Sequence, residues 1–156
     1  MPEPVDDAQA EAASRSYPGH RQHLFPGCFC CGPDRSLGDG LRIFPSPVPG
    51  RDVVAAPWVP NAADANEHGV VRREIVWAAF DCPQLWSLIL GAPTDSADRV
   101  VMGALEAQLL GPVIAQERYV VVAWPSGREG RRLFAEAALF SGEGVRLWAL
   151  LARRPC

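Results

Sequence analysis

The stretch that decides the fold is residues 74–90, which read E-I-V-W-A-A-F-D-C-P-Q-L-W-S-L-I-L. Apolar side chains recur at intervals of three and four residues, which predicts a helix with a buried face. The members of that face are Ile75, Ala78, Ala79, Cys82, Leu85, Trp86 and Ile89. The remaining positions are also mostly apolar, with Trp77, Phe80, Leu88 and Leu90 among them. Such a helix must be covered on more than one side, and in a small protein a second subunit can supply part of the cover.

Predicted strands lie on both sides of this helix in the sequence. Two short ones precede it, at residues 41–44 and 52–58, and a polar loop follows them at 59–72. Four longer strands come after the helix, at residues 99–110, 116–124, 131–140 and 145–152. The breaks between these four are short and contain glycine, which predicts an antiparallel meander. The order indicates an α+β domain in which one antiparallel sheet wraps around a central helix, paired with a second copy by two-fold symmetry.

Length and charge favour a single domain without a nucleic-acid or membrane partner. The chain has 156 residues, of which 48% are hydrophobic, and a net charge of −3. A basic surface for nucleic acid is therefore not expected. The longest apolar run, residues 75–92, is interrupted by Asp81 and Pro83 and does not resemble a membrane span. Residues 1–25 lack hydrophobic periodicity and are predicted to be a mobile tail, followed by one domain at 26–156.

The cysteines indicate a reducing compartment. There are five, an odd number, and three of them crowd together at positions 28, 30 and 31. This pattern makes a poor disulfide framework, so a cytoplasmic protein is expected. The acidic N-terminus is unlike a targeting peptide.

Three motifs now support a named resemblance. The run Cys28-Phe29-Cys30-Cys31-Gly32-Pro33, followed by Gly40-Leu41-Arg42-Ile43-Phe44, looks like the opening segment of many hotdog-fold thioesterase-like proteins. Residues 77–83 resemble the central-helix segment of an actinobacterial-style subgroup, and residues 127–131 resemble one of its hairpin turns. The chain thus resembles the hotdog superfamily of the PaaI-like acyl-CoA thioesterase type. The resemblance implies the hotdog fold, a homodimer or homotetramer, and an acyl-CoA or similar thioester as substrate, with no cofactor.

Asp81 is the predicted catalytic residue. It is the only carboxylate between residues 75 and 92, and burying an unpaired carboxylate is costly unless it has a partner or a task. The resemblance implies an active site at the subunit interface, where a helix carboxylate acts as general base or as nucleophile. The alternative is structural: Asp81 caps a helix that starts at Cys82, because Pro83 suits a first turn. The helical neighbours Trp77, Gln84 and Leu88 are predicted to line the substrate groove.

Two further groups are candidates for the same reaction. Related thioesterases carry a His-Gly-Gly segment before the central helix, which implies an oxyanion role for His68 and Gly69; here Val70 replaces the second glycine. The alternative for His68 is an exposed loop histidine. Arg128 and Arg131, in the predicted hairpin, are expected to bind the phosphates of coenzyme A. Their alternative is a solvated turn.

Two other functions stay open from the residues alone. One is a non-catalytic hotdog module that binds an acyl or aromatic ligand. The other is a zinc-binding domain, because four side chains near the N-terminus could ligate zinc tetrahedrally: His20, His23, Cys28 and Cys31. The cysteines also fit the hotdog opening segment without metal, so the primary expectation is a thioesterase without a metal.

Overall fold

The structure, a computed structural model, describes residues 2–91, 102–142 and 146–151. A six-stranded sheet has the order β1-β2-β4-β5-β6-β3, and every neighbouring pair is antiparallel. Its strands are β1 (Ser46–Pro47), β2 (Val54–Trp58), β3 (Glu106–Leu109), β4 (Tyr119–Glu129), β5 (Arg132–Ser141) and β6 (Arg146–Leu151). The helices are α1 (Asp7–Ser14) and α2 (Arg73–Gly91), with short 3-10 turns at Pro18–His20 and Ala62–Asp64.

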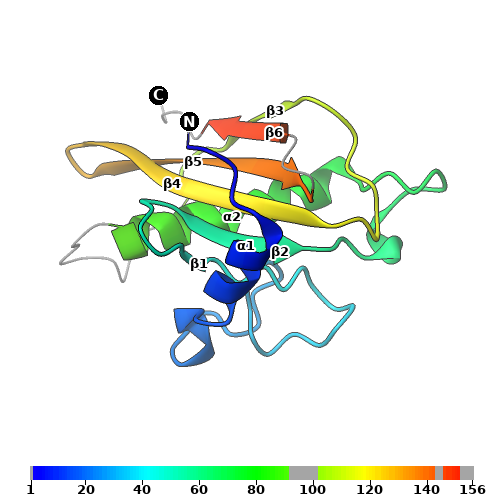
Figure 1. Cartoon of the computed structure of the whole chain (residues 1–156), viewed down its shortest axis with the longest axis horizontal. Coiled ribbons are helices and arrows are strands. Elements are labelled where there is room, and N and C mark those ends of the chain that lie inside the picture. The colour runs from blue at the N-terminus through cyan, green and yellow to red at the C-terminus, as the bar shows by residue number, and fades with distance from the viewer. Residues whose placement is uncertain (1, 92–101, 143–145, 152–156) are drawn as a thin grey trace.

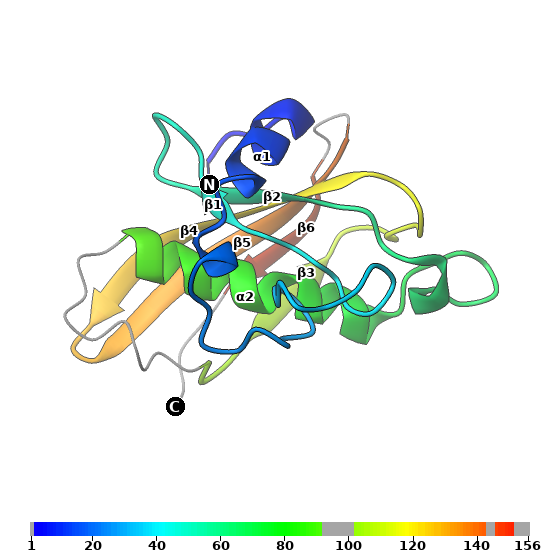
Figure 2. The same ribbon diagram turned by 90° about the horizontal axis from the view of Figure 1, so that it is seen from below.

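The molecule has three layers (Figure 2), with α2 on one face of the sheet and α1 on the other. The alternation of β4 explains how both faces are buried, since successive strand residues point in opposite directions. Tyr119, Val121 and Ala123 belong to the core on the α2 side. Val120 and Val122 belong to a second core with α1. This arrangement confirms the predicted α+β architecture of an antiparallel sheet around one central helix.

The structure differs from the predicted strand at residues 41–44. Leu41 and Ile43 are buried there, and their N–H groups donate to the carbonyl oxygens of Phe29 and Cys30. Arg42 between them has a φ of 52°, in the left-handed region, which no regular strand adopts. The alternating apolar residues are therefore buried, but they belong to a loop that packs on the cysteine segment and not to a strand. The first strand, β1, lies just beyond it.

The predicted meander is wrong at one place. The short break at Gly111-Pro112 predicted that the strand before it pairs with β4, but β3 pairs with β6 at the edge of the sheet (Figure 1). Residues 110–118 instead cross over, with Val113 fully buried and Ile114 bridged to Val70. Burial of Val113 in the core on the α2 side holds this crossing in place. Residues 99–101, 145 and 152 of the predicted strands lie outside the described residues.

The predicted tail also differs from what the structure shows. Asp6 caps α1, since its Oδ1 accepts the Gln9 N–H at 2.8 Å. Val5, Ala10 and Ala13 are buried in the core between α1 and the sheet. Small alanines gave little hydrophobic signal, although they let α1 approach the sheet closely. Arg118 next to β4 pairs with two carboxylates of α1, Asp7 at 2.6 Å and Glu11.

Within the described ranges, none of the helices combines the length and apolar character needed to span a bilayer.

Candidate functional site

The helix α2 presents four rows of side chains spaced four residues apart. Two rows are buried, namely Ile75, Ala79, Pro83 and Ser87, and Val76, Phe80, Gln84 and Leu88. A third row, with Cys82 and Trp86, faces the N-terminal segment. The fourth row is half-exposed and consists of Trp77, Asp81, Leu85 and Ile89. Asp81 is therefore the one carboxylate in an otherwise apolar outward row.

Asp81 lies inside a continuous helix of 19 residues, so the interpretation of Asp81 as a helix cap is wrong. Pro83 is tolerated in the interior, although its missing N–H leaves the Ala79 carbonyl without its helical partner. Burial, followed by the electrostatic effect of the neighbouring Cys28, raises the pKa of the Asp81 carboxyl above its usual value. Within the described part of the chain, no cation or hydrogen-bond donor contacts this carboxylate.

A cluster of three sulfurs lies beside Asp81. The Sγ atoms of Cys28, Cys31 and Cys82 all lie within 4.8 Å of one another, and the Cys28 and Cys82 sulfurs are 3.5 Å apart. Hydrogen bonds from the thiols of Cys31 and Cys82, and the backbone N–H groups of Cys31 and Cys30, lower the pKa of Cys28. The same contacts to Cys28 raise the pKa of Cys31 and of Cys82. The close contacts among these thiols therefore shift their pKa values in opposite directions.

Aromatic rings from the N-terminal segment close one side of this cluster. Tyr17 is buried, and its hydroxyl donates to the Cys31 carbonyl at 3.2 Å. Its ring meets Trp86 edge-on, with centroids 5.0 Å apart. His23 lies against the same tryptophan, and its Nε2 is 3.3 Å from the Cys31 sulfur. Burial lowers the pKa of His23 and, together with the Cys31 contact, raises that of Tyr17.

The loop of His68 and Gly69 is held by Asn66. The Asn66 Oδ1 accepts the N–H groups of His68 and Val70, each at 3.0 Å, and the Gly69 N–H donates to the Asn66 carbonyl at 3.0 Å. These three N–H groups are consequently engaged within the loop. The His68 side chain is 77% exposed and lies 3.6 Å from Glu67. The His68 imidazole therefore lies in solvent and not in the core.

The predicted substrate residues fall into three environments. Trp77 is half-buried in the same row as Asp81, whereas Gln84 and Leu88 are buried in a neighbouring row. Gln84 has a buried Nε2 atom without a hydrogen-bond partner among the described residues. Arg128 and Arg131 are exposed at the β4–β5 hairpin. The end of α2 lies near the start of this hairpin, because Gly91 approaches Pro125. Only Trp77 and Asp81 therefore share one surface.

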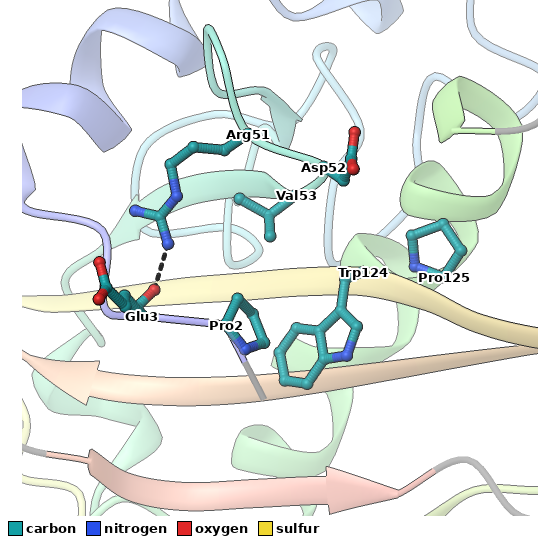
Figure 3. A pocket seen from close by; sticks show the side chains of 7 residues that line it. All are labelled: Pro2, Glu3, Arg51, Asp52, Val53, Trp124 and Pro125. Atoms are coloured by element: carbon teal, nitrogen blue, oxygen red, sulfur yellow. Dashed lines mark hydrogen bonds between the residues drawn. The ribbon is translucent and has the colours of Figure 1, made fainter.

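A hollow of about 480 Å³ lies elsewhere, where the N-terminal segment crosses the sheet (Figure 3). Arg51 spans its rim and donates to the carbonyl oxygens of Glu3 and Pro4. Its lining residues are Pro2, Glu3, Arg51, Asp52, Val53, Trp124 and Pro125. None of these is a predicted site residue, and the hollow is open and shallow. The half-buried carboxylate of Asp81 and the cysteine cluster lie on or beside α2 instead.

The sequence missed one member of the cysteine cluster. It grouped His20 with His23, Cys28 and Cys31, but the His20 ring lies edge-on against Tyr17 and Phe44 instead. Cys82 comes from α2 and takes the place that His20 was expected to fill. Cys82 directly follows Asp81 in the sequence, but its spacing from Cys28 did not form a recognisable metal-binding motif.

No family model matches this sequence, and no curated protein matches it. Solved structures do match. The Escherichia coli PaaI protein of the phenylacetic acid degradation operon aligns with a TM-score of 0.55 at 10% identity, over 63% of this chain and 71% of that one. A putative thioesterase from Ralstonia eutropha aligns with a TM-score of 0.53 at 21% identity, over 64% and 72%. A hypothetical thioesterase from Streptococcus pneumoniae, solved with coenzyme A, aligns with a TM-score of 0.55 at 9% identity, over 63% and 75%.

These structures confirm the predicted hotdog fold, and two of the three, from Ralstonia eutropha and Streptococcus pneumoniae, are named as thioesterases. The resemblance to an actinobacterial-style subgroup stays a prediction.

Proposed function

We propose, from the hotdog fold of this chain, that it hydrolyses an acyl-CoA or a related thioester in the cytoplasm, with Asp81 as its catalytic carboxylate. The observation that carries the proposal is the half-buried Asp81 in the outward row of the central helix. A carboxylate among Trp77, Leu85 and Ile89 loses hydration, and without a partner or a task this would be costly. Coenzyme A in the pneumococcal structure of the same fold supports the class of ligand.

Two routes use the same carboxylate. As a general base, Asp81 takes a proton from water while the water oxygen attacks the thioester carbonyl, and the thiolate leaves. As a nucleophile, a carboxylate oxygen attacks the carbonyl, the thiolate leaves, and water then hydrolyses the resulting anhydride. Rapid quenching followed by mass spectrometry of the intact protein distinguishes them, because only the second route adds the acyl group to the chain.

A second copy of the chain completes the proposed site. The apolar members of the outward row extend along α2, and a two-fold partner would cover them and shield Asp81 from water. Trp77 is the proposed wall of the acyl groove, with Leu88 and Gln84 behind it; the Gln84 Nε2 has no partner among the described residues. Arg128 and Arg131 are the proposed contacts to coenzyme A phosphates, since a guanidinium suits phosphate oxygens. His68 and Gly69 are the proposed oxyanion-binding residues, in the loop before α2. Their N–H groups would have to release Asn66 before they could bind an oxyanion.

The test is thiol release from a panel of short, long and aromatic acyl-CoA substrates. Asp81→Asn is expected to lower kcat/KM by about 10²–10⁴-fold, the usual contribution of a positioned base. Glu74→Gln is the matched control, because Glu74 is an exposed carboxylate on the same helix and should leave turnover unchanged. Equal turnover by wild type and Asp81→Asn would remove the assigned role.

The second candidate is a hotdog module that binds an acyl or aromatic ligand without turning it over. The engaged N–H of Gly69 favours it, because an oxyanion hole needs free donors. Calorimetry with acyl-CoA separates the two functions. Tight binding that leaves the thioester intact over hours would select the binding module.

A further inference from the structure

The cysteine cluster has a geometry that the proposed reaction does not use. Its three sulfurs come from two distant parts of the chain, the 28–31 turn and α2, and the His23 Nε2 lies 3.3 Å from one of them, the Cys31 sulfur. A single buried cysteine usually serves as a small apolar side chain. Three clustered thiols with an imidazole beside them are the donor set of a structural zinc site. We propose that the chain binds one zinc ion there, with the ligands Cys28, Cys31, Cys82 and His23.

The distances support a tetrahedral site. With zinc–sulfur bonds of about 2.3 Å, two thiolates of a tetrahedron lie about 3.8 Å apart. The Cys28 and Cys82 sulfurs are 3.5 Å apart, and all three sulfurs lie within 4.8 Å of one another. The His23 Nε2 is 3.3 Å from the Cys31 sulfur. The three sulfurs are already close to these distances, whereas the His23 turn would have to move to bring Nε2 onto the same ion.

The turn of residues 28–32 is built to present two of the ligands. The Gly32 N–H donates to the Cys28 carbonyl at 2.9 Å, and the Cys28 N–H donates to Phe25 at 2.8 Å. A Cβ on Gly32 would lie 2.4 Å from the Pro26 carbonyl oxygen, so only glycine fits. This tight turn brings the side chains of Cys28 and Cys31, separated by two residues, to the same side.

His23 requires one local change. Its Nδ1 accepts the Phe25 N–H at 2.9 Å, which leaves the imidazole proton on Nε2, facing Cys31. Zinc at Nε2 displaces that proton, so the neutral ring carries its proton on Nδ1 and the Phe25 peptide turns away. Leu24 and Phe25 are 65% and 71% exposed, which gives this turn room to adjust.

The proposed ion is structural because the chain supplies all four ligands and leaves no open position for substrate. Three thiols lose their protons on binding, so the site carries one net negative charge. The ion joins the N-terminal segment to α2 at the residue after Asp81. It does not depend on the proposed thioesterase activity, since a binding module would need the same anchor.

The test is metal analysis of the full-length protein purified under reducing conditions without added metal. We expect about one zinc per chain. After exchange, cobalt should give the thiolate-to-metal charge-transfer band and the intense visible bands of a tetrahedral site. Cys28→Ser and Cys82→Ser should lose the metal, and His23→Ala should bind it at least about tenfold more weakly. His20→Ala is the control and should keep it, because the His20 ring lies edge-on against Tyr17 and Phe44.

Cobalt exchange into wild type keeps the test decisive if the serine variants fail to fold. Protein with less than about one-tenth zinc per chain and no tetrahedral cobalt spectrum after reduction and reconstitution would overturn the proposal. A Cys28–Cys82 disulfide that persists under the reducing conditions of purification would overturn it as well. Loss of zinc from His20→Ala with retention in Cys82→Ser would transfer the site to other ligands and reject this one. None of these readouts uses thioester turnover, so the two proposals can fail separately.

Discussion

The sulfur of Cys82 on α2 lies 3.5 Å from the sulfur of Cys28, although the two residues are 54 positions apart. Cys82 directly follows Asp81, so this contact connects the 28–31 turn to the helical turn that carries the proposed catalytic carboxylate. Any substitution that displaces the 28–31 turn should therefore also displace Asp81. The solvent access of the half-exposed row of α2, by contrast, depends on whether a second copy of the chain covers it.

Gly32→Ala should disrupt the cysteine turn. The added Cβ would lie 2.4–2.5 Å from backbone atoms of Pro26 and Cys28, which cannot yield as a flexible side chain can. We expect a loss of about 1–3 kcal/mol in unfolding free energy and weaker metal binding. Gly27→Ala is the matched control in the same loop, because its Cβ meets nothing within 4 Å. Urea denaturation of both variants measures the difference, and equal stability of the two would contradict the turn geometry.

Leu85→Asp should separate the proposed subunits. Leu85 is half-exposed in this chain, so the charge disturbs folding little but lies in the surface that a second copy would cover. Sedimentation velocity should show a smaller species for this variant, and turnover should fall with it. Leu37→Asp is the control, because Leu37 is 90% exposed and lies in a loop outside α2. An unchanged sedimentation coefficient for Leu85→Asp would place the interface elsewhere.

Gln84→Met should leave stability unchanged or raise it by about 1 kcal/mol. The Gln84 Nε2 is buried without a partner among the described residues, and removal of an unsatisfied donor ends its desolvation cost. The Ser87 hydroxyl donates to the Gln84 backbone carbonyl at 2.7 Å, and this bond survives the substitution. Turnover should decrease if the amide binds substrate. Thermal unfolding and thiol release on one preparation test both effects, and a clear loss of stability would show that the amide has a structural partner.

Ala10→Asp should detach α1 from the sheet. Ala10 is fully buried in the core between α1 and β2, and an unpaired carboxylate there is costly. We expect a loss of about 1–3 kcal/mol and faster tryptic cleavage at Arg15 and Arg21. Ala8→Asp is the control on the exposed side of the same helix. Equal protease resistance of the two variants would mean that α1 contributes nothing to the folded domain.

The Arg42 and His20 regions show where local pattern was insufficient. Apolar alternation at residues 41–44 predicted a strand, but the positive φ of Arg42 bends this segment around the cysteine turn. His20 has suitable spacing for a metal ligand, yet Tyr17 and Phe44 hold its ring. In both places a contact with a distant residue outweighed the local preference.

The sequence by itself determined α2, the strands β2, β4 and β5, and Asp81 as the carboxylate within the central helix. These features follow from the periodicity of neighbouring residues, which is a local property of the chain. Only the tertiary structure decided that β3 pairs with β6, that α1 packs on the sheet, and that Cys82 joins Cys28 and Cys31. Those pairings depend on distances between segments far apart in sequence, and these are set by how the whole core packs.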